Sequence, residues 1–318
     1  ECMPIYSHLT SGHGYGSEVV MCADALLLRG MDKQAEIRAH QAYYMAQSKG
    51  QTCLSMCAEL ILSRVALLRG DGAALSASRG RIGALAANAF DNVLPRMAEL
   101  CGAWLDLTLG QTEDLPAWLL DPRRMEQVLY VQSLPLGQVL YGRYLLLSGR
   151  LQELIGLTEP MRCAAEDQHC LLAEIYHLLH LSAALCAQGD GEQALQALRQ
   201  AMERALPDGV LLPFAELYGR LEPLLDAVPD CPSMPCLREL CRRQAAGVRQ
   251  VRGEVRPAHF RLTRREREIA RLAQRRLTAR EIADTLFISE STVRSALKTV
   301  YSKLQIHSKG QLAQFEPF

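Results

Sequence analysis

A glycine recurs about every forty residues along the first part of the chain, and each one ends an apolar run. These glycines are Gly30, Gly70, Gly110, Gly149 and Gly189, at spacings of 40, 40, 39 and 40. A glycine after an apolar helix supplies the left-handed residue that ends it. Each period therefore predicts two antiparallel helices joined by a tight turn. Such a unit cannot bury its apolar face alone, so the five units are expected to stack.

The repeat predicts an all-α solenoid over residues 1–225, and no strand-like alternation is present. The spacing of glycines and of the small residues after them resembles the tetratricopeptide repeat (TPR), although the period exceeds the usual length of about 34 residues. We therefore expect TPR-like hairpins with longer helices. The concave surface of such a superhelix suits a peptide, a partner protein or a small effector. Aromatic residues in its middle are either core or an effector pocket: Trp104, Tyr141 and Tyr144, with Trp118, Tyr130 and Tyr176.

Charge is divided unevenly along the chain, although the net charge is zero. Residues 1–240 carry 18 Lys and Arg against 28 Asp and Glu, whereas residues 241–318 carry 17 against 7. An acidic body with a basic C-terminal module indicates that one end binds a polyanion. The alternative, a basic face that is only solvated, leaves this concentration of charge unexplained.

Cysteine usage and hydropathy indicate the class of protein. The eleven cysteines are scattered over apolar helical faces, where a free cysteine packs as a small hydrophobe. This favours a cytoplasmic protein with reduced thiols. No apolar run approaches the ~20 residues of a membrane-spanning helix, and no secretion signal follows Glu1. A chain that starts at Glu1 is expected to be a fragment of a longer protein.

Candidate metal and catalytic sites are weak. Cys163, His169, Cys170, His177 and His180 lie close in sequence, but no tight C-x-x-C pair accompanies them, so core or surface roles are favoured over zinc. The glycine-rich "SGHGYGSE" near the N-terminus has neither the spacing nor the lysine of a phosphate-binding loop. No Ser/His/Asp set or carboxylate pair has recognisable spacing. The sequence predicts no enzyme, no metal and no cofactor on this chain.

The composition changes near Pro229, where Pro229, Pro232 and Pro235 interrupt the helical pattern. Residues 226–257 are therefore predicted to be a linker, in which Arg242–Pro257 reads as a helix end followed by a basic stretch, and residues 258–318 a separate small domain.

Helix caps divide this last domain. Thr263 and Thr278 each precede a glutamate by three residues, which predicts a capping box and a helix start. Ser289 is expected to begin a third helix that runs to about Leu304, and Ser308 a fourth that runs to about Phe315. The second and third helices, with a short turn between them, have the arrangement of a helix-turn-helix. Its predicted core is Leu262, Ile269, Leu272, Ile282, Ala283, Leu286, Ile288, Val293, Leu297, Val300, Leu304 and Ile306.

The third helix has two different faces. Val293, Leu297, Val300 and Leu304 repeat at helical spacing and are expected to pack inward. The opposite face of its N-terminal half carries cations and hydroxyls, which suit base edges and phosphates in a major groove: Ser291, Arg294, Ser295 and Lys298.

The segments "LTRRERE", "REIADTLFISESTVRSAL" and "VYSKL" closely resemble the LuxR-type helix-turn-helix domain over about 55 residues. The resemblance implies a four-helix DNA-binding domain in which Arg294, Ser295 and Lys298 face the bases of double-stranded DNA. It places Thr278, Arg280, Ser289, Thr292 and Lys303 at the phosphate backbone. It also suggests a homodimer through Ser308–Phe315. Many members have a histidine where this chain has Ala296, so the DNA sequence that those members bind cannot be transferred to this chain.

The order of helical repeats, linker and LuxR-type domain resembles the C-terminal half of MalT-like activators. In that group an upstream NTPase domain binds ATP, and the helical repeats receive an effector or partner. The sequence thus predicts a bacterial, cytoplasmic transcription regulator that senses a signal. The alternative is a protein-interaction scaffold in which the helix-turn-helix serves docking or dimerisation.

Overall fold

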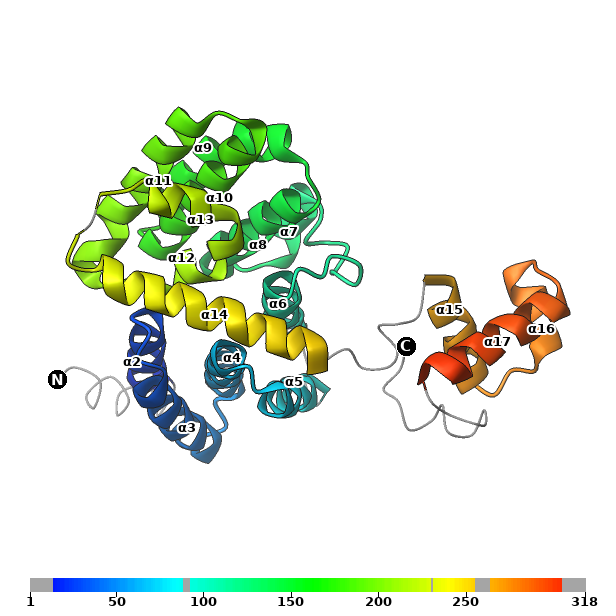
Figure 1. Ribbon diagram of the computed structural model, residues 1–318. Coiled ribbons are helices and arrows are strands. Elements are labelled where there is room, and N and C mark those ends of the chain that lie inside the picture. Colours follow the sequence, from blue (N-terminus) through cyan, green and yellow to red (C-terminus); the bar gives the residue numbers. More distant parts are fainter. Residues whose placement is uncertain (1–13, 88–91, 230, 255–263, 305–318) are drawn as a thin grey trace. The chain divides into compact units, whose positions relative to one another are not determined.

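The computed structural model describes residues 14–87, 92–229, 231–254 and 264–304, and every regular element in these ranges is a helix (Figure 1). The predicted all-α class is therefore confirmed. The chain divides into two compact units, Glu1–Val251 and Arg252–Phe318. None of the helices in the described ranges is both long enough and apolar enough to span a membrane.

The first unit is built from helical hairpins with the predicted period. Four complete hairpins are α2 (Ser17–Leu28) with α3 (Asp32–Ser48), α4 (Thr52–Arg69) with α5 (Gly72–Ala87), α8 (Leu134–Leu147) with α9 (Leu151–Asp167), and α10 (Leu171–Gln188) with α11 (Gly191–Ala205). The five repeat glycines all adopt positive φ, between 70° and 89°. A residue with a side chain is strained there, so the predicted left-handed turns are confirmed.

The third repeat departs from the prediction. Its first helix, α6 (Val93–Thr108), ends before Gly110 as expected, but no long second helix follows. Residues 111–121 run as turns, followed by the short α7 (Pro122–Val128) and a 3-10 turn, η1 (Val131–Ser133). Pro116 and Pro122 lack the amide hydrogen that a helix interior needs. Leu115 and Trp118 are nevertheless buried, so the irregular segment covers the core in place of a helix.

The first helices of the hairpins surround a common interior. In chain order α2, α4, α6, α8 and α10 each contact the next. The short α12 (Leu212–Glu216) then contacts both α10 and α2. The amide of Leu211 donates to the carbonyl of Leu28 at 2.8 Å, and Arg29 Nε donates to the carbonyl of Asp208 at 3.0 Å. These bonds join the last turns of the array to its first helix.

Ion pairs lie in this interior where α2, α4, α8 and α12 approach one another. Glu216 accepts from Arg64 Nε at 3.2 Å, from Arg143 Nη2 at 3.0 Å and from the Tyr176 hydroxyl at 2.9 Å. Arg64 Nη1 also donates to Asp24 at 3.1 Å. Burial alone would raise the pKa of Glu216, but the guanidiniums of Arg64 and Arg143 hold that pKa below its usual value. Glu216 is therefore a charged link between residues far apart in sequence.

The predicted linker over residues 226–257 is wrong for most of its length. After α13 (Tyr218–Asp226), residues 234–254 form the long helix α14 (Met234–Glu254), which runs beside α2 and α4 (Figure 1). Its buried side chains recur at helical spacing: Met234, Leu237, Leu240, Cys241, Gln244 and Val251. Arg243 pairs with Asp32 at 2.8 Å. The three prolines mark only the break before α14, because the first turn of a helix tolerates proline.

The second unit contains α15 (Arg264–Gln274), α16 (Ala279–Leu286) and α17 (Glu290–Leu304). Predicted core residues that are buried there are Ile269, Ile282, Ala283, Val293 and Val300, and Leu272, Leu286, Ile288 and Leu297 pack around them. Leu262, Thr263, Ile306 and the predicted fourth helix over Ser308–Phe315 lie outside the described residues, as does the side chain of Leu304.

Candidate nucleic-acid interface

The start of α16 is fixed by the predicted capping box. The Thr278 hydroxyl accepts from the amide of Glu281 at 3.3 Å, and the Glu281 carboxylate accepts from the amide of Thr278 at 2.7 Å. The Thr278 hydroxyl also donates to that carboxylate at 2.8 Å. Two amides that a helix start leaves without partners are thus satisfied.

The turn between α16 and α17 is short and sharply bent. Phe287 has φ 53° and is 95% exposed. The amide of Ile288 donates to the carbonyl of Ala283 at 3.1 Å. Ser289 begins α17 by accepting from the amide of Thr292 at 3.1 Å. The predicted helix-turn-helix arrangement is confirmed.

The outward face of α17 carries the predicted base-facing residues. Val293 and Val300 are fully buried, whereas Arg294, Ser295 and Lys298 are exposed. At the start of the helix, Ser289 Oγ lies 2.8 Å from Ser291 Oγ and 2.7 Å from Thr292 Oγ1. A helix N-terminus with hydroxyl groups attracts phosphate oxygens. The face therefore combines a cationic surface with groups suited to a phosphate.

Glu290 was not singled out by the sequence analysis, yet it contacts the main candidate base reader. Its Oε1 accepts from Arg294 Nε at 3.0 Å and from Arg294 Nη2 at 2.6 Å. The glutamate stands four residues before the arginine, a spacing that brings opposite charges together on a helix. That spacing is the signal that identifies it. The carboxylate occupies the same donors that would read a guanine.

Basic charge remains concentrated in the second unit after the domain boundary is corrected. Arg242, Arg243 and Arg249 belong to α14 in the first unit. Residues 252–318 still carry 14 Lys and Arg against 7 Asp and Glu. Arg280, a predicted phosphate contact, is exposed on α16. The side chain of Lys303 lies outside the described residues.

Residues 261–315 match the family model described as "Bacterial regulatory proteins, luxR family". The spore germination protein GerE of Bacillus subtilis (strain 168) is 44% identical over 50 residues, which cover 16% of this chain and 68% of GerE. The chain belongs to the luxR family of bacterial regulatory proteins. No solved structure matches it significantly. The family match agrees with the helix-turn-helix geometry of α16 and α17 and supports a DNA-binding transcription regulator.

The luxR-family match covers the second unit, and the first unit carries the predicted effector residues. The structure does not gather these aromatics into one site but places them in separate pairs. Trp104 packs edge-on against Tyr176, with ring centres 5.4 Å apart, in the interior of the unit. Tyr141 stacks on Tyr144 at 6.2 Å and donates to Glu153 of α9 at 2.8 Å. Trp104 and Tyr176 line an interior pocket, whereas Tyr141 and Tyr144 are not among its lining residues.

The histidine and cysteine cluster is divided between the core and the surface: His177 and His180 are core, Cys170 is half-buried, and Cys163 and His169 are exposed. His177 and His180 are fully buried, and burial lowers the pKa of His177 to about 4 and that of His180 well below its usual value. Cys163 is exposed and lies by Glu159. The described residues contain no group of three or more potential ligands that could hold a metal ion.

Proposed function

We propose that this luxR-family chain is a sequence-specific transcription regulator that reads double-stranded DNA with α17. The observation that carries the proposal is the outward face of α17, where Arg294, Ser295 and Lys298 stand exposed opposite a buried valine face. Arginine and lysine pair with the acceptor atoms of guanine in the major groove, and serine bonds to several base edges. With double-stranded DNA as its partner, the chain would act in the bacterial cytoplasm.

Phosphate contacts would set the register of the domain on DNA. Ser289 and Thr292 lie at the N-terminus of α17, and Arg280 is exposed on α16. We assign these residues, with Lys303, to the phosphate backbone of the DNA. Thr278 is the remaining predicted phosphate contact. The Thr278 hydroxyl is engaged by Glu281, so the contribution of Thr278 would be to hold the start of α16 in place.

The first unit would receive the signal, as the resemblance to MalT-like activators implies. An effector or partner protein that binds its interior would change self-association of the chain, with Ser308–Phe315 as the proposed dimer element. Two domains would then bind a two-part DNA site. No cofactor is assigned to this chain.

The test is selection of bound sequences from a random duplex pool by the full chain at physiological salt. We expect one motif to be enriched. Arg294→Ala should lower discrimination at one position by about 1–3 kcal/mol. Arg275→Ala is the matched control, because it removes the same charge from an exposed position outside α17 and should weaken all sequences equally.

Equal losses by Arg294→Ala on the motif and on random DNA would overturn base reading by that residue. Absence of binding to any duplex even at low salt would overturn the regulator and favour the interaction scaffold.

A further inference from the structure

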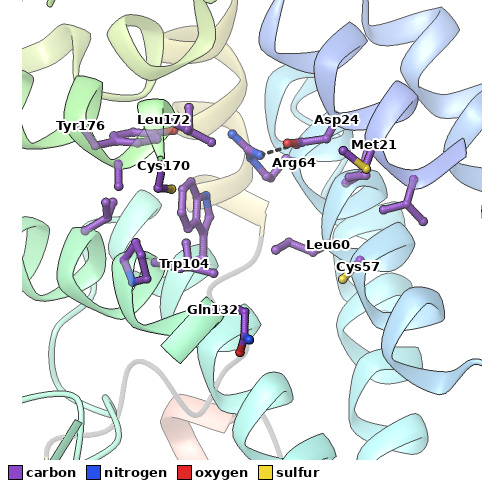
Figure 2. Close-up of a pocket in the computed structure, with 16 residues that line it drawn as sticks. Met21, Asp24, Cys57, Leu60, Arg64, Trp104, Gln132, Cys170, Leu172 and Tyr176 are labelled. Carbon is purple, nitrogen blue, oxygen red and sulfur yellow. Dashed lines mark hydrogen bonds and ion pairs between the residues drawn. The ribbon is translucent and has the colours of Figure 1, made fainter. Parts of the chain in front are cut away.

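The interior of the first unit contains a pocket of about 330 Å³. Its walls come from α2, α4, α6, α8 and α10, with one residue from η1. Figure 2 shows Leu60 and Arg64 on one side, facing Trp104 and Tyr176 on the other. Most of the lining is aliphatic or aromatic. A pocket of this size, with apolar walls and a few polar groups, is typical of a site for a small molecule.

The charges at this pocket are already balanced. Arg64 and Arg143 are matched by Asp24 and Glu216, with each arginine paired to Glu216 and Arg64 also paired to Asp24. The side chain of Arg64 is only 7% exposed. A charged ligand would leave an uncompensated charge in this buried environment, which is costly. The occupant that fits is uncharged.

Two buried donors on side chains that line the pocket lack a hydrogen-bond acceptor among the described residues. They are Trp104 Nε1 and Arg64 Nη2. Arg64 Nη2 lies 3.2 Å from Glu216 Oε1, but without the direction of a hydrogen bond, so Trp104 Nε1 is the clearer case. The Arg64 guanidinium lies 4.9 Å from the centre of the Trp104 ring. A buried donor without an acceptor costs free energy that a ligand oxygen would recover.

We propose that this pocket binds a small, mostly apolar, uncharged molecule whose single carbonyl oxygen accepts from Trp104 Nε1 beside the Arg64 guanidinium. Ketones, esters and amides have this chemistry. The inference rests on the proposed function, because it names the ligand class that the first unit would sense. Helices from five successive repeats contribute to the walls.

The experiment uses prodan, an uncharged fluorescent naphthyl ketone, and the matched naphthalene without the ketone. Both are titrated into the full chain, and binding is followed by energy transfer from tryptophan. The chain has two tryptophans, so in Trp118→Phe the energy transfer to prodan comes from Trp104 alone. We expect saturable prodan binding and about tenfold weaker binding of the hydrocarbon, the loss of one hydrogen bond.

Trp104→Phe keeps an aromatic ring and removes the unpaired donor together with part of the apolar surface of the indole. Both probes lose that apolar contact, but only the ketone loses a hydrogen bond, so the roughly tenfold preference for prodan over the hydrocarbon should disappear. Binding to Trp104→Phe is read from prodan emission. Trp118→Phe is the control, because Trp118 Nε1 already has an acceptor, Glu99, at 2.5 Å. This substitution should leave prodan binding unchanged. If Trp104→Phe does not fold, Leu136→Trp replaces it, since this half-buried lining residue would fill the pocket and abolish binding.

Equal affinities of the wild-type chain for the ketone and the hydrocarbon would overturn the inference. An unchanged preference for the ketone in Trp104→Phe, or unchanged prodan binding by Leu136→Trp where that variant replaces it, would also overturn it. The titration contains no DNA, so its result is separate from that of the DNA selection. A chain that selects a DNA motif but does not discriminate the ketone overturns the pocket alone. A chain that discriminates the ketone but binds no duplex supports the pocket and overturns the proposed regulator.

Discussion

Substitution of Gly247 tests whether α14 packs against the hairpins or only links two domains. A Cβ atom at this position would fall against the carbonyl oxygen of Leu67 and within 3.0 Å of Leu68 O and Gly70 N. All three are backbone atoms at the end of α4, so no side chain can rotate away. The clash can be relieved only if α14 moves away from the hairpins, and this movement disturbs the packing of the buried face of α14.

In an isolated helix or a solvated linker, Gly→Ala raises helix propensity by about 1 kcal/mol. Overpacking against rigid neighbours costs about 1–3 kcal/mol. Because the neighbours at Gly247 are backbone atoms, this cost should lie near the upper end, about 3 kcal/mol, and the gain in helix propensity offsets about 1 kcal/mol of it. We therefore expect Gly247→Ala to lower the free energy of unfolding of the first unit by about 2 kcal/mol. Gly253→Ala lies on the same helix with nothing within 4 Å of its Cβ, and should be neutral or stabilising by up to about 1 kcal/mol.

The assay is urea denaturation of the full chain followed by far-UV circular dichroism. A Gly247→Ala protein as stable as the wild type, or stabilised as much as Gly253→Ala, would refute the packed position of α14. It would also restore residues 226–257 as a linker.

Three further predictions follow from the buried charges and from α17. Acidification from about pH 7 to about pH 5 should destabilise the first unit. The pKa of His177 is about 4 in the folded protein and about 6.5 in the unfolded chain. The unfolded chain therefore binds more protons between these pH values, and stability is lost as the pH falls. His177 contributes about 2 kcal/mol at pH 5, and His180 acts in the same direction; a flat stability profile in calorimetry between these pH values would contradict this. Glu216→Gln should cost about 3 kcal/mol, because it leaves two buried guanidiniums without their shared carboxylate; an unchanged melting temperature would exclude that role. Glu290→Gln should release Arg294 from its 2.6 Å ion pair and strengthen binding to random duplex, measured as a gel shift; weaker binding would show that Glu290 instead holds the arginine in its reading position.

The sequence was most informative where a pattern is local. The five glycines predicted their left-handed turns, because the conformation of a helix end depends on residues within a few positions. Thr278, three residues before Glu281, predicted the start of α16 for the same reason. The alternation of faces on α17 follows from helical periodicity and places Arg294 outward without any tertiary information.

The sequence analysis failed where local signals competed. Prolines and arginines before and within residues 234–254 indicated a linker, although the apolar positions already had helical spacing. An apolar helix face is buried only if another part of the protein packs against it. Here the turns at Gly30 and Gly70, which are distant in sequence, pack against α14. The third repeat also lacks a long second helix, because Pro116 and Pro122 disfavour a continuous helix there. A repeat defined by its glycines takes no account of these prolines.

The sequence by itself determined the helical class, the repeat, the left-handed turns and the luxR-type helix-turn-helix, because each depends on residue types at fixed spacings. Only the tertiary structure decided which side chains meet in the interior. Arg64, Arg143 and Glu216 lie 73 to 152 residues apart where they pair, and the donor of Trp104 is left without a partner beside them. Their meeting depends on the curvature that brings α12 back to α2. That curvature is the sum of the packing of every hairpin on the next, so no short stretch of sequence encodes it.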